Sequence, residues 1–478
     1  MIEQAILSPL GTLGAVLAPL LHIVLAGAVT LHVLERKRDV AAAVAWIGVA
    51  WLSPIIGSAL YILFGVNRVQ RRAFRAGRRR RSMGWVDDPA TFLNPRHDHF
   101  APLERAIGVL TGRPPRLGNK VTMLRNGDEA YPPMLEAIAA AKISIAFASY
   151  IFEADGTGVK FIEALRAAKA RGVAIRVIVD GIGSGYWYSP AYHRLVKAGI
   201  PVARFMHTLV PWRMAFLNLR SHKKILVIDG SRAFIGGINI SSDNVLAAHP
   251  PDPIRDMHFD VTGPVVTQIA EVFAHDWDFC TGERLGGQAW FPPLAEAGTA
   301  AARVITSGPD QDIYKIEFAM LQAIGCALRS VKILTPYFLP DDRLMSALIL
   351  AAMAGVSVDV VIPEAGDHPY LDWATRAHVA PLLRAGGRVW RAPKPFEHSK
   401  LFVVDDGWSL IGSANWDMRS LRLNFELNME VCCPEFGALV SAAIARRQGD
   451  PLTLAEINAR SLPTRLRDNA ARLLLPYL

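Results

Sequence analysis

Residues 221–239 read SHKKILVIDGSRAFIGGIN, and residues 398–415 repeat the pattern as HSKLFVVDDGWSLIGSAN. In both copies a His is followed two residues later by Lys, seven later by Asp, fourteen later by Gly and seventeen later by Asn. The matching residues are His222, Lys224, Asp229, Gly236 and Asn239 in the first copy, and His398, Lys400, Asp405, Gly412 and Asn415 in the second. Five shared offsets indicate an internal duplication.

Each copy predicts two paired strands beside its His and Lys. Residues 225–228 and 401–404 are apolar, as in a buried strand, where residues two apart share a face. We therefore expect the His and Lys of each copy to point the same way. A second apolar run follows a turn at Asp-Gly, which is typical of an antiparallel hairpin and returns the Asn to the same side.

This pattern resembles the HKD motif of the phospholipase D superfamily, HxKxxxxD followed by GxxN, from about Asn119 to the end of the chain. The resemblance implies an α/β fold of two similar lobes, residues 119–295 and 296–478, with mostly parallel sheets flanked by helices. A pseudo-twofold axis would bring the two motifs into one cleft. The β-α-β order supports this, with strands expected at residues 143–151 and 173–179 around a helix, and again at 331–337 and 356–362.

Two long uncharged runs precede these lobes, at residues 7–34 and 40–65. As a helix the second run would reach ~39 Å, more than the ~30 Å of bilayer hydrocarbon. We therefore expect a membrane segment, residues 1–66, with two transmembrane helices. A cleaved signal peptide is disfavoured because the N-terminus lacks a positive region and a second apolar run follows. A buried helix pair is disfavoured because the polar residues form no stripe.

The net charge of +9 comes mainly from a cluster of arginines after the second run. Its eight members are Arg68, Arg71, Arg72, Arg75, Arg78, Arg79, Arg80 and Arg81. By the positive-inside rule they indicate a cytoplasmic location for the lobes, although Arg36, Lys37 and Arg38 favour the opposite orientation. The cluster could also bind anionic head groups. The remaining charge, close to neutral, disfavours nucleic acid as a partner.

Residues 67–118 predict a connector, first basic and then rich in Pro, with a short helix near residues 103–110. The cysteines show neither a CxxC motif nor Cys/His metal spacing, so we expect no disulfide framework and no metal site. They are Cys280, Cys326, Cys432 and Cys433.

Two imidazoles suit the cleavage of a phosphodiester, because one can attack phosphorus to give a phosphohistidine while the other protonates the leaving oxygen. Lys224, Lys400, Asn239 and Asn415 would hold the non-bridging oxygens. The lysines supply positive charge, so no metal or other cofactor is expected. The sequence leaves open which His attacks; the family resemblance favours His222 as nucleophile and His398 as general acid and base.

Each imidazole also needs an acceptor for its other nitrogen. The resemblance implies carboxylates for this task, with Glu426, 28 residues after His398, and Asp256, 34 residues after His222, as candidates. It gives Asp229 and Asp405 a supporting role in the fold of the motif. Substrate binding is expected of Arg220, for which a surface role is equally open, and of Ser413.

The N-terminal segment also resembles that of bacterial cardiolipin synthases. The residues that carry this resemblance are Lys37, Arg38, Asp39, Trp46, Pro54, Gly57, Tyr61, Phe64 and Gly65. It implies transfer of a phosphatidyl group between two phosphatidylglycerol molecules, giving cardiolipin and glycerol, by a multi-pass enzyme of the bacterial inner membrane.

Three alternatives remain. A membrane phospholipase D would pass the intermediate to water or another alcohol. A membrane-anchored nuclease is disfavoured by the near-neutral charge of the lobes, and a non-catalytic scaffold by two intact sets of His, Lys and Asn. The oligomeric state and the second lipid donor are left open by the sequence.

Overall fold

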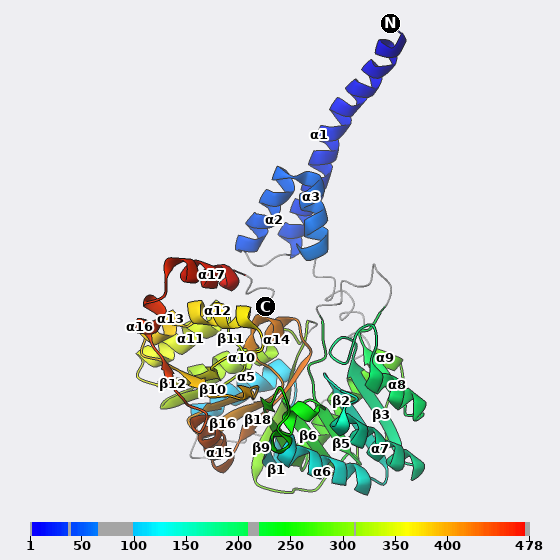
Figure 1. The fold of residues 1–478 in the computed structure, drawn as a ribbon, viewed down its shortest axis with the longest axis vertical. Helices are drawn as coiled ribbons and strands as arrows, with labels where there is room; N and C mark the ends of the chain where they lie inside the picture. The colour runs from blue at the N-terminus through cyan, green and yellow to red at the C-terminus, as the bar shows by residue number, and fades with distance from the viewer. Residues whose placement is uncertain (1, 37–39, 66–98, 209–218, 310–311, 474–478) are drawn as a thin grey trace. The chain divides into compact units, whose positions relative to one another are not determined.

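The structure, a computed structural model, describes residues 2–36, 40–65, 99–208, 219–309 and 312–473. The chain divides into two compact units, Met1–Arg75 and Ala76–Leu478 (Figure 1). Residues 67–98 of the expected connector, which hold the arginine cluster, lie outside the described residues. The short helix expected near residues 103–110 is confirmed as α5 (Ala101–Thr111).

The described part of the N-terminal unit contains α1 (Ile2–Arg36), α2 (Val40–Leu52), α3 (Pro54–Leu60) and a π-helical turn, Tyr61–Gly65. The single helix expected over residues 40–65 is wrong, because Pro54 has no backbone N–H to continue the hydrogen bonding of α2. Among the side chains that the structure describes, no helix combines the length and the hydropathy needed to cross a bilayer. The two expected transmembrane helices are therefore not found there.

The second unit is built around one sheet of fifteen strands, at whose centre β1 (Arg116–Arg125) and β9 (Ala300–Ser307) pair. Outward from β1 lie β8 (Met257–Thr262), β6 (Arg232–Gly236), β5 (Ile225–Ile228), β2 (Ser144–Ser149), β3 (Ala174–Asp180) and β4 (Val202–Phe205). Outward from β9 lie β18 (Glu426–Cys432), β16 (Trp408–Gly412), β15 (Leu401–Val404), β10 (Ser330–Leu334), β12 (Ser357–Pro363), β13 (Arg388–Ala392) and β19 (Pro451–Leu452). Each strand from β1 outward to β4 has a counterpart at the same position from β9 outward to β13, whereas β19 has none. The exact lobe boundaries stay a prediction.

The sheet is mixed, so the expectation of mostly parallel pairing is wrong. Parallel pairs among its described strands are limited to β2–β3, β3–β4, β10–β12 and β12–β13. These are the strands joined through helices, as the β-α-β pattern predicted. The motif strands β5–β6 and β15–β16 are joined by tight turns, which permit only antiparallel pairing.

Helices cover both faces of the sheet. In the first half they are α6 (Asn126–Ala140), α7 (Gly156–Ala170), α8 (Pro190–Lys197) and α9 (Val265–Thr281). In the second they are α10 (Lys315–Gly325), α11 (Asp342–Met353), α12 (Pro369–His378), α13 (Ala380–Arg384), α14 (Met418–Arg422), α15 (Pro434–Ala445), α16 (Leu454–Asn458) and α17 (Leu462–Arg472). Two short strands outside the large sheet, β7 (Ile254–Arg255) and β14 (Phe396–Glu397), pair with each other, as do β11 (Phe338–Leu339) and β17 (Trp416–Asp417).

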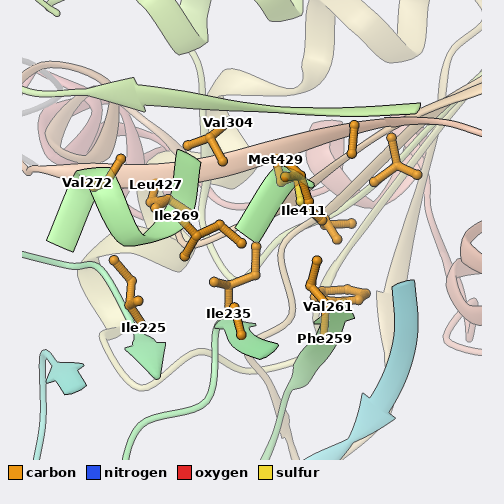
Figure 2. Packing of buried hydrophobic residues seen from close by; sticks show 14 of the residues in the cluster. Ile225, Ile235, Phe259, Val261, Ile269, Val272, Val304, Ile411, Leu427 and Met429 are labelled. Carbon is orange, nitrogen blue, oxygen red and sulfur yellow. The ribbon is translucent and has the colours of Figure 1, made fainter. Parts of the chain in front are cut away.

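Alternate residues of the motif strands enter different hydrophobic cores. Ile225 and Val227 of β5 belong to a core shared by both halves, whereas Leu226 and Ile228 pack under the helices of the first half. Figure 2 shows the shared core, where Ile235 and Phe259 lie near Ile411 and Met429 of the other half. Burial of apolar side chains from both halves therefore holds the two motif hairpins at fixed positions.

Candidate active site

Asp229 and Asp405 fix the two motif hairpins to neighbouring strands. Each carboxylate accepts hydrogen bonds of 2.7–3.3 Å from three consecutive backbone N–H groups at the start of β2 or β10. The donors are Lys142, Ile143 and Ser144 for Asp229, and Leu328, Arg329 and Ser330 for Asp405. Both aspartates lie at positive φ, 51° and 52°, in the turns that end β5 and β15.

The structure brings His222 and His398 together. Their ring centroids lie 6.5 Å apart with the planes at 80°; His222 is buried and His398 is partly buried. The backbone N–H of His222 donates to Phe425 O at 2.9 Å, and that of His398 donates to Arg255 O at 2.8 Å. Each imidazole is thus carried by a segment bonded to the opposite half of the sheet.

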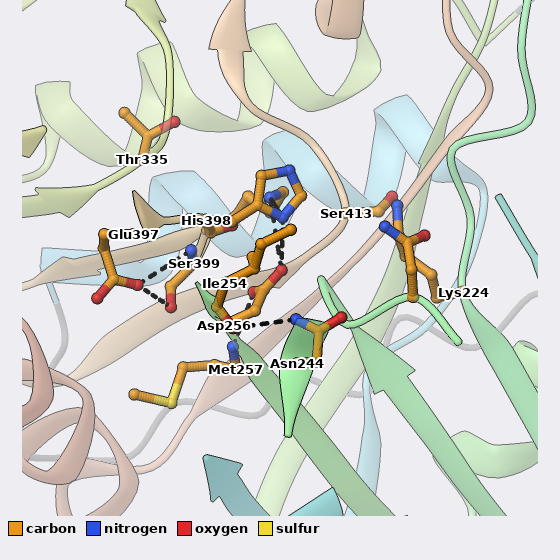
Figure 3. Close-up of polar contacts among 12 residues, drawn as sticks. Lys224, Asn244, Ile254, Asp256, Met257, Thr335, Glu397, His398, Ser399 and Ser413 are labelled. Atoms are coloured by element: carbon orange, nitrogen blue, oxygen red, sulfur yellow. Dashed lines mark hydrogen bonds and ion pairs between the residues drawn. The ribbon is translucent and has the colours of Figure 1, made fainter. Parts of the chain in front are cut away.

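The carboxylates that orient the imidazoles are exchanged between the halves. Nδ1 of His222 lies 3.1 Å from Oε2 of Glu426, and Nδ1 of His398 lies 2.6 Å from Oδ2 of Asp256. Figure 3 shows the second of these contacts, with His398 beside Asp256. Sequence spacing counted each carboxylate from the His of its own copy, whereas in the structure each contacts the His of the other copy.

Ser413 supports the first of these pairs. Its hydroxyl donates to Oε2 of Glu426 at 2.5 Å, and its carbonyl oxygen lies 2.9 Å from Nδ1 of His222. Because Nδ1 of His222 is within reach of two acceptors, it carries the hydrogen and leaves the lone pair on Nε2. Direct contact of Ser413 with substrate stays a prediction.

Two buried lysines accompany the imidazoles. Nζ of Lys224 donates to His222 O at 2.9 Å and lies 5.2 Å from the ring centroid of Tyr150, and Nζ of Lys400 donates to His398 O. Burial, aided by the charge of Lys400, lowers the pKa of Lys224 to about 7. Burial lowers the pKa of Lys400 to about 8, although Asp256 opposes the shift. An anion bound between the two would favour their charged forms.

Burial also lowers the pKa of both imidazoles. For His222 the charge of Glu426 opposes the effect of burial. For His398 the charges of Lys400 and Lys224 add to it, so that its pKa lies well below the usual value. Nζ of Lys400 also lies 2.9 Å from Nδ1 of His398, so this nitrogen faces an ammonium as well as a carboxylate. The two imidazoles therefore have different surroundings despite the duplicated motif.

Residues 134–277 and 320–446 match the protein family described as cardiolipin synthase, PLD-like domain. The chain belongs to this family. It is 31% identical over 459 residues to a cardiolipin synthase of Geobacillus thermodenitrificans, an alignment that covers 93% of this chain and 90% of that protein. It is 30% identical to the major cardiolipin synthase of Bacillus subtilis, over 93% of this chain and 95% of that one.

A solved structure shares the fold. The phosphatidylserine synthase of Haemophilus influenzae superposes with a TM-score of 0.58 at 14% identity, covering 79% of this chain and all of that one. The two segments matched to the cardiolipin synthase domain each contain one HKD motif, and the match confirms the resemblance recognised in the sequence.

The two motif asparagines of this cardiolipin synthase family member differ in their contacts. Oδ1 of Asn239 accepts from the backbone N–H of Ile151 at 3.2 Å. Oδ1 of Asn415 is buried and has no hydrogen-bond partner among the described residues. Arg220 donates from Nη1 to the hydroxyl of Tyr150 at 2.9 Å, and the Tyr150 ring packs edge-on against His222 at 4.9 Å between centroids.

Two buried aspartates near the site were missed by sequence reasoning. Asp180 accepts from the backbone N–H of Ser221 at 2.8 Å, and burial raises its pKa to about 6. Asp417 caps α14 by accepting from Ser420 N–H at 2.6 Å, and burial raises its pKa to about 6. Asp180 could have been found from its place at the carboxyl end of an expected parallel strand, and Asp417 from its place before a helix.

Proposed function

We propose that this chain is a cardiolipin synthase that transfers the phosphatidyl group of one phosphatidylglycerol to the hydroxyl of another, releasing glycerol. The observation that carries the proposal is the pair of imidazoles, 6.5 Å apart, each held by a carboxylate from the opposite half. That distance leaves room for one phosphorus atom between two nitrogens.

His222 is the nucleophile in this proposal. Glu426 and the carbonyl of Ser413 hold the hydrogen on its Nδ1, so the lone pair of Nε2 attacks phosphorus. As the N–P bond forms, the bond from phosphorus to the glycerol oxygen breaks and His398 gives that oxygen a proton. His398 then takes the proton from the acceptor hydroxyl, whose oxygen attacks phosphorus and displaces His222.

Lys224 and Lys400 stabilise the non-bridging oxygens during both steps, with Asn239 and Asn415 as further donors. The lowered pKa values of about 7 and about 8 follow mainly from burial of the two ammonium groups. Binding of the phosphodiester raises both pKa values and keeps the lysines charged when charge builds on phosphorus.

The N-terminal unit places this chemistry at a membrane in our proposal. Its helices expose large apolar side chains, among them Leu31 at 72%, Val40 at 75% and Leu52 at 88%. Lipid contact would remove this apolar surface from water. The arginine cluster after it favours a cytoplasmic location of the catalytic lobes, residues 119–295 and 296–478, at the bacterial inner membrane.

Purified protein supplied with phosphatidylglycerol alone tests the function. We expect cardiolipin and glycerol in equal amounts. Phosphatidic acid as the main product would replace the synthase by a membrane phospholipase D, which uses the same phosphohistidine. Absence of any lipid product, together with cleavage of nucleic acid, would favour the anchored nuclease.

A further inference from the structure

Two arginines near the site break the symmetry of the duplication. Arg220 lies two residues before His222, and the matching position before His398 is Phe396. Arg419 lies 21 residues after His398, and the matching position after His222 is Asp243. The His, Lys and Asn that serve phosphorus occur twice, whereas each of these arginines occurs once.

Arg220 is held next to the imidazole of His222. Its Nη1 donates to the Tyr150 hydroxyl at 2.9 Å, and its carbonyl oxygen accepts from Phe425 N–H at 2.8 Å. Its Nε is buried and has no hydrogen-bond partner among the residues that the structure describes. A ligand anion would supply the missing acceptor.

Arg419 comes from the other half of the sheet. It belongs to α14, and its carbonyl oxygen accepts from Leu423 N–H at 2.8 Å and from Asn424 N–H at 2.9 Å. Asn424 directly precedes Phe425, whose N–H donates to the carbonyl oxygen of Arg220, so the backbones of the two arginines are joined through adjacent residues. Burial, followed by the positive charge of Arg220, lowers the pKa of Arg419. An anion that contacts both guanidinium groups would offset their mutual repulsion.

The tyrosine near His398 has a partner of the opposite charge to the partner of Tyr150. Tyr337, the counterpart of Tyr150, bonds to Asp367 at 2.8 and 2.9 Å, where Tyr150 bonds to Arg220. The ring of His368 stacks on Tyr337 at 6.4 Å. One side of the site is thus cationic and the other acidic, although the catalytic groups between them are duplicated.

We propose that Arg220 and Arg419 bind the phosphate of the acceptor lipid, the phosphatidylglycerol whose hydroxyl attacks the phosphohistidine. This inference rests on the proposed function. In the acceptor, the phosphate and the attacking hydroxyl occupy opposite ends of one glycerol, so binding the phosphate positions the hydroxyl at phosphorus. Water and simple alcohols lack this phosphate, so the arginine pair favours synthesis over hydrolysis.

The unmodified enzyme provides the first test. Phosphatidylglycerol vesicles are supplied with equal concentrations of isotope-labelled glycerol and of glycerophosphoglycerol, the deacylated acceptor. We expect the phosphate-bearing acceptor to take the phosphatidyl group about a hundredfold more often, the effect of two charge-assisted hydrogen bonds, one from each arginine, at about tenfold each. Equal use of both acceptors overturns the inference.

Variants give the second test. In R419Q and R220Q the ratio of the two products should fall about tenfold, and R419K should restore most of it. R384Q, which removes the exposed arginine at the end of α13, is the matched control and should keep the unmodified ratio. Both acceptors draw on one intermediate, so a general loss of activity leaves the ratio unchanged.

The outcomes separate the two proposals. An unmodified enzyme that forms no cardiolipin overturns the proposed function and the inference with it. An enzyme that forms cardiolipin but keeps its product ratio in R419Q and R220Q retains the function and loses the acceptor site. A ratio that falls equally in R384Q would assign the effect to overall charge and also overturn the acceptor site.

Discussion

Exchange of carboxylates between the halves predicts which chemical step each carboxylate supports. Glu426 contacts the proposed nucleophile His222, whereas Asp256 contacts the proposed acid His398. In E426Q the attack on phosphorus should slow, whatever the leaving group. In D256N protonation of the leaving group should slow, and a leaving group that needs no proton should escape the effect.

The size of each effect follows from the charged hydrogen bond that the substitution removes. A hydrogen bond to a charged group contributes about 1.5–3 kcal/mol, which corresponds to about ten- to hundredfold in rate. We expect the larger loss in D256N with phosphatidylglycerol, because its contact with His398 is 2.6 Å while that of Glu426 with His222 is 3.1 Å. Both carboxylates are buried, so solvent cannot replace them.

The assay compares phosphatidylglycerol with a phosphatidyl ester of p-nitrophenol, whose anion leaves without protonation. D256N should release p-nitrophenol in a first turnover at nearly the unmodified rate, and E426Q should remain slow. S409A, which removes a buried hydroxyl of β16 that has no hydrogen-bond partner among the described residues, is a control for packing. The reverse pattern, with E426Q rescued and D256N slow, would refute the assignment.

Three further predictions concern the same groups. Burial lowers the pKa of Lys224 to about 7 and that of Lys400 to about 8 in the free enzyme, so kcat/KM should fall as pH rises through 7–8. Bound phosphodiester raises both pKa values, so kcat should fall only at higher pH. A kcat/KM that stays flat to about pH 10 would contradict this. With the p-nitrophenyl ester, whose leaving group needs no proton, H398N should accumulate a phosphatidyl adduct on His222, detected by intact mass, and H222N should accumulate none; an adduct in H222N would exchange the roles of the two imidazoles. D405A removes the acceptor of three backbone N–H groups, so urea unfolding should show a loss of about 3 kcal/mol, and D406A, which removes a half-exposed neighbouring carboxylate, should lose much less.

The motif hairpins could be predicted from the sequence because both their apolar runs and their turns are local signals. The strands β5 and β15 begin directly after the His-x-Lys, and Asp229 and Asp405 occupy the turns that follow. The β-α-β units were found for the same reason. Antiparallel pairing of most strands was missed because the motif strands β6 and β16 also pair with β8 and β18, at the centre of each half.

The exchange of Glu426 and Asp256 could not be read from spacing. It depends on contacts such as that between Ser221 and Phe425, which lie 204 residues apart in the chain. The end of α2 inside the second apolar run, by contrast, could have been predicted from the sequence. Pro54 stands in the middle of residues 40–65, and a proline inside an apolar run predicts the end of a helix.

Neither half of the catalytic unit is a smaller version of the enzyme. A chain cut between β8 and β9 would leave a fragment with His222 but without Glu426, and another with His398 but without Asp256. Each fragment would expose the apolar side chains of Ile235 or Met429 that meet in the shared core. A truncated product is therefore expected to be inert and prone to aggregation, and only reassembly of both pieces would recover turnover.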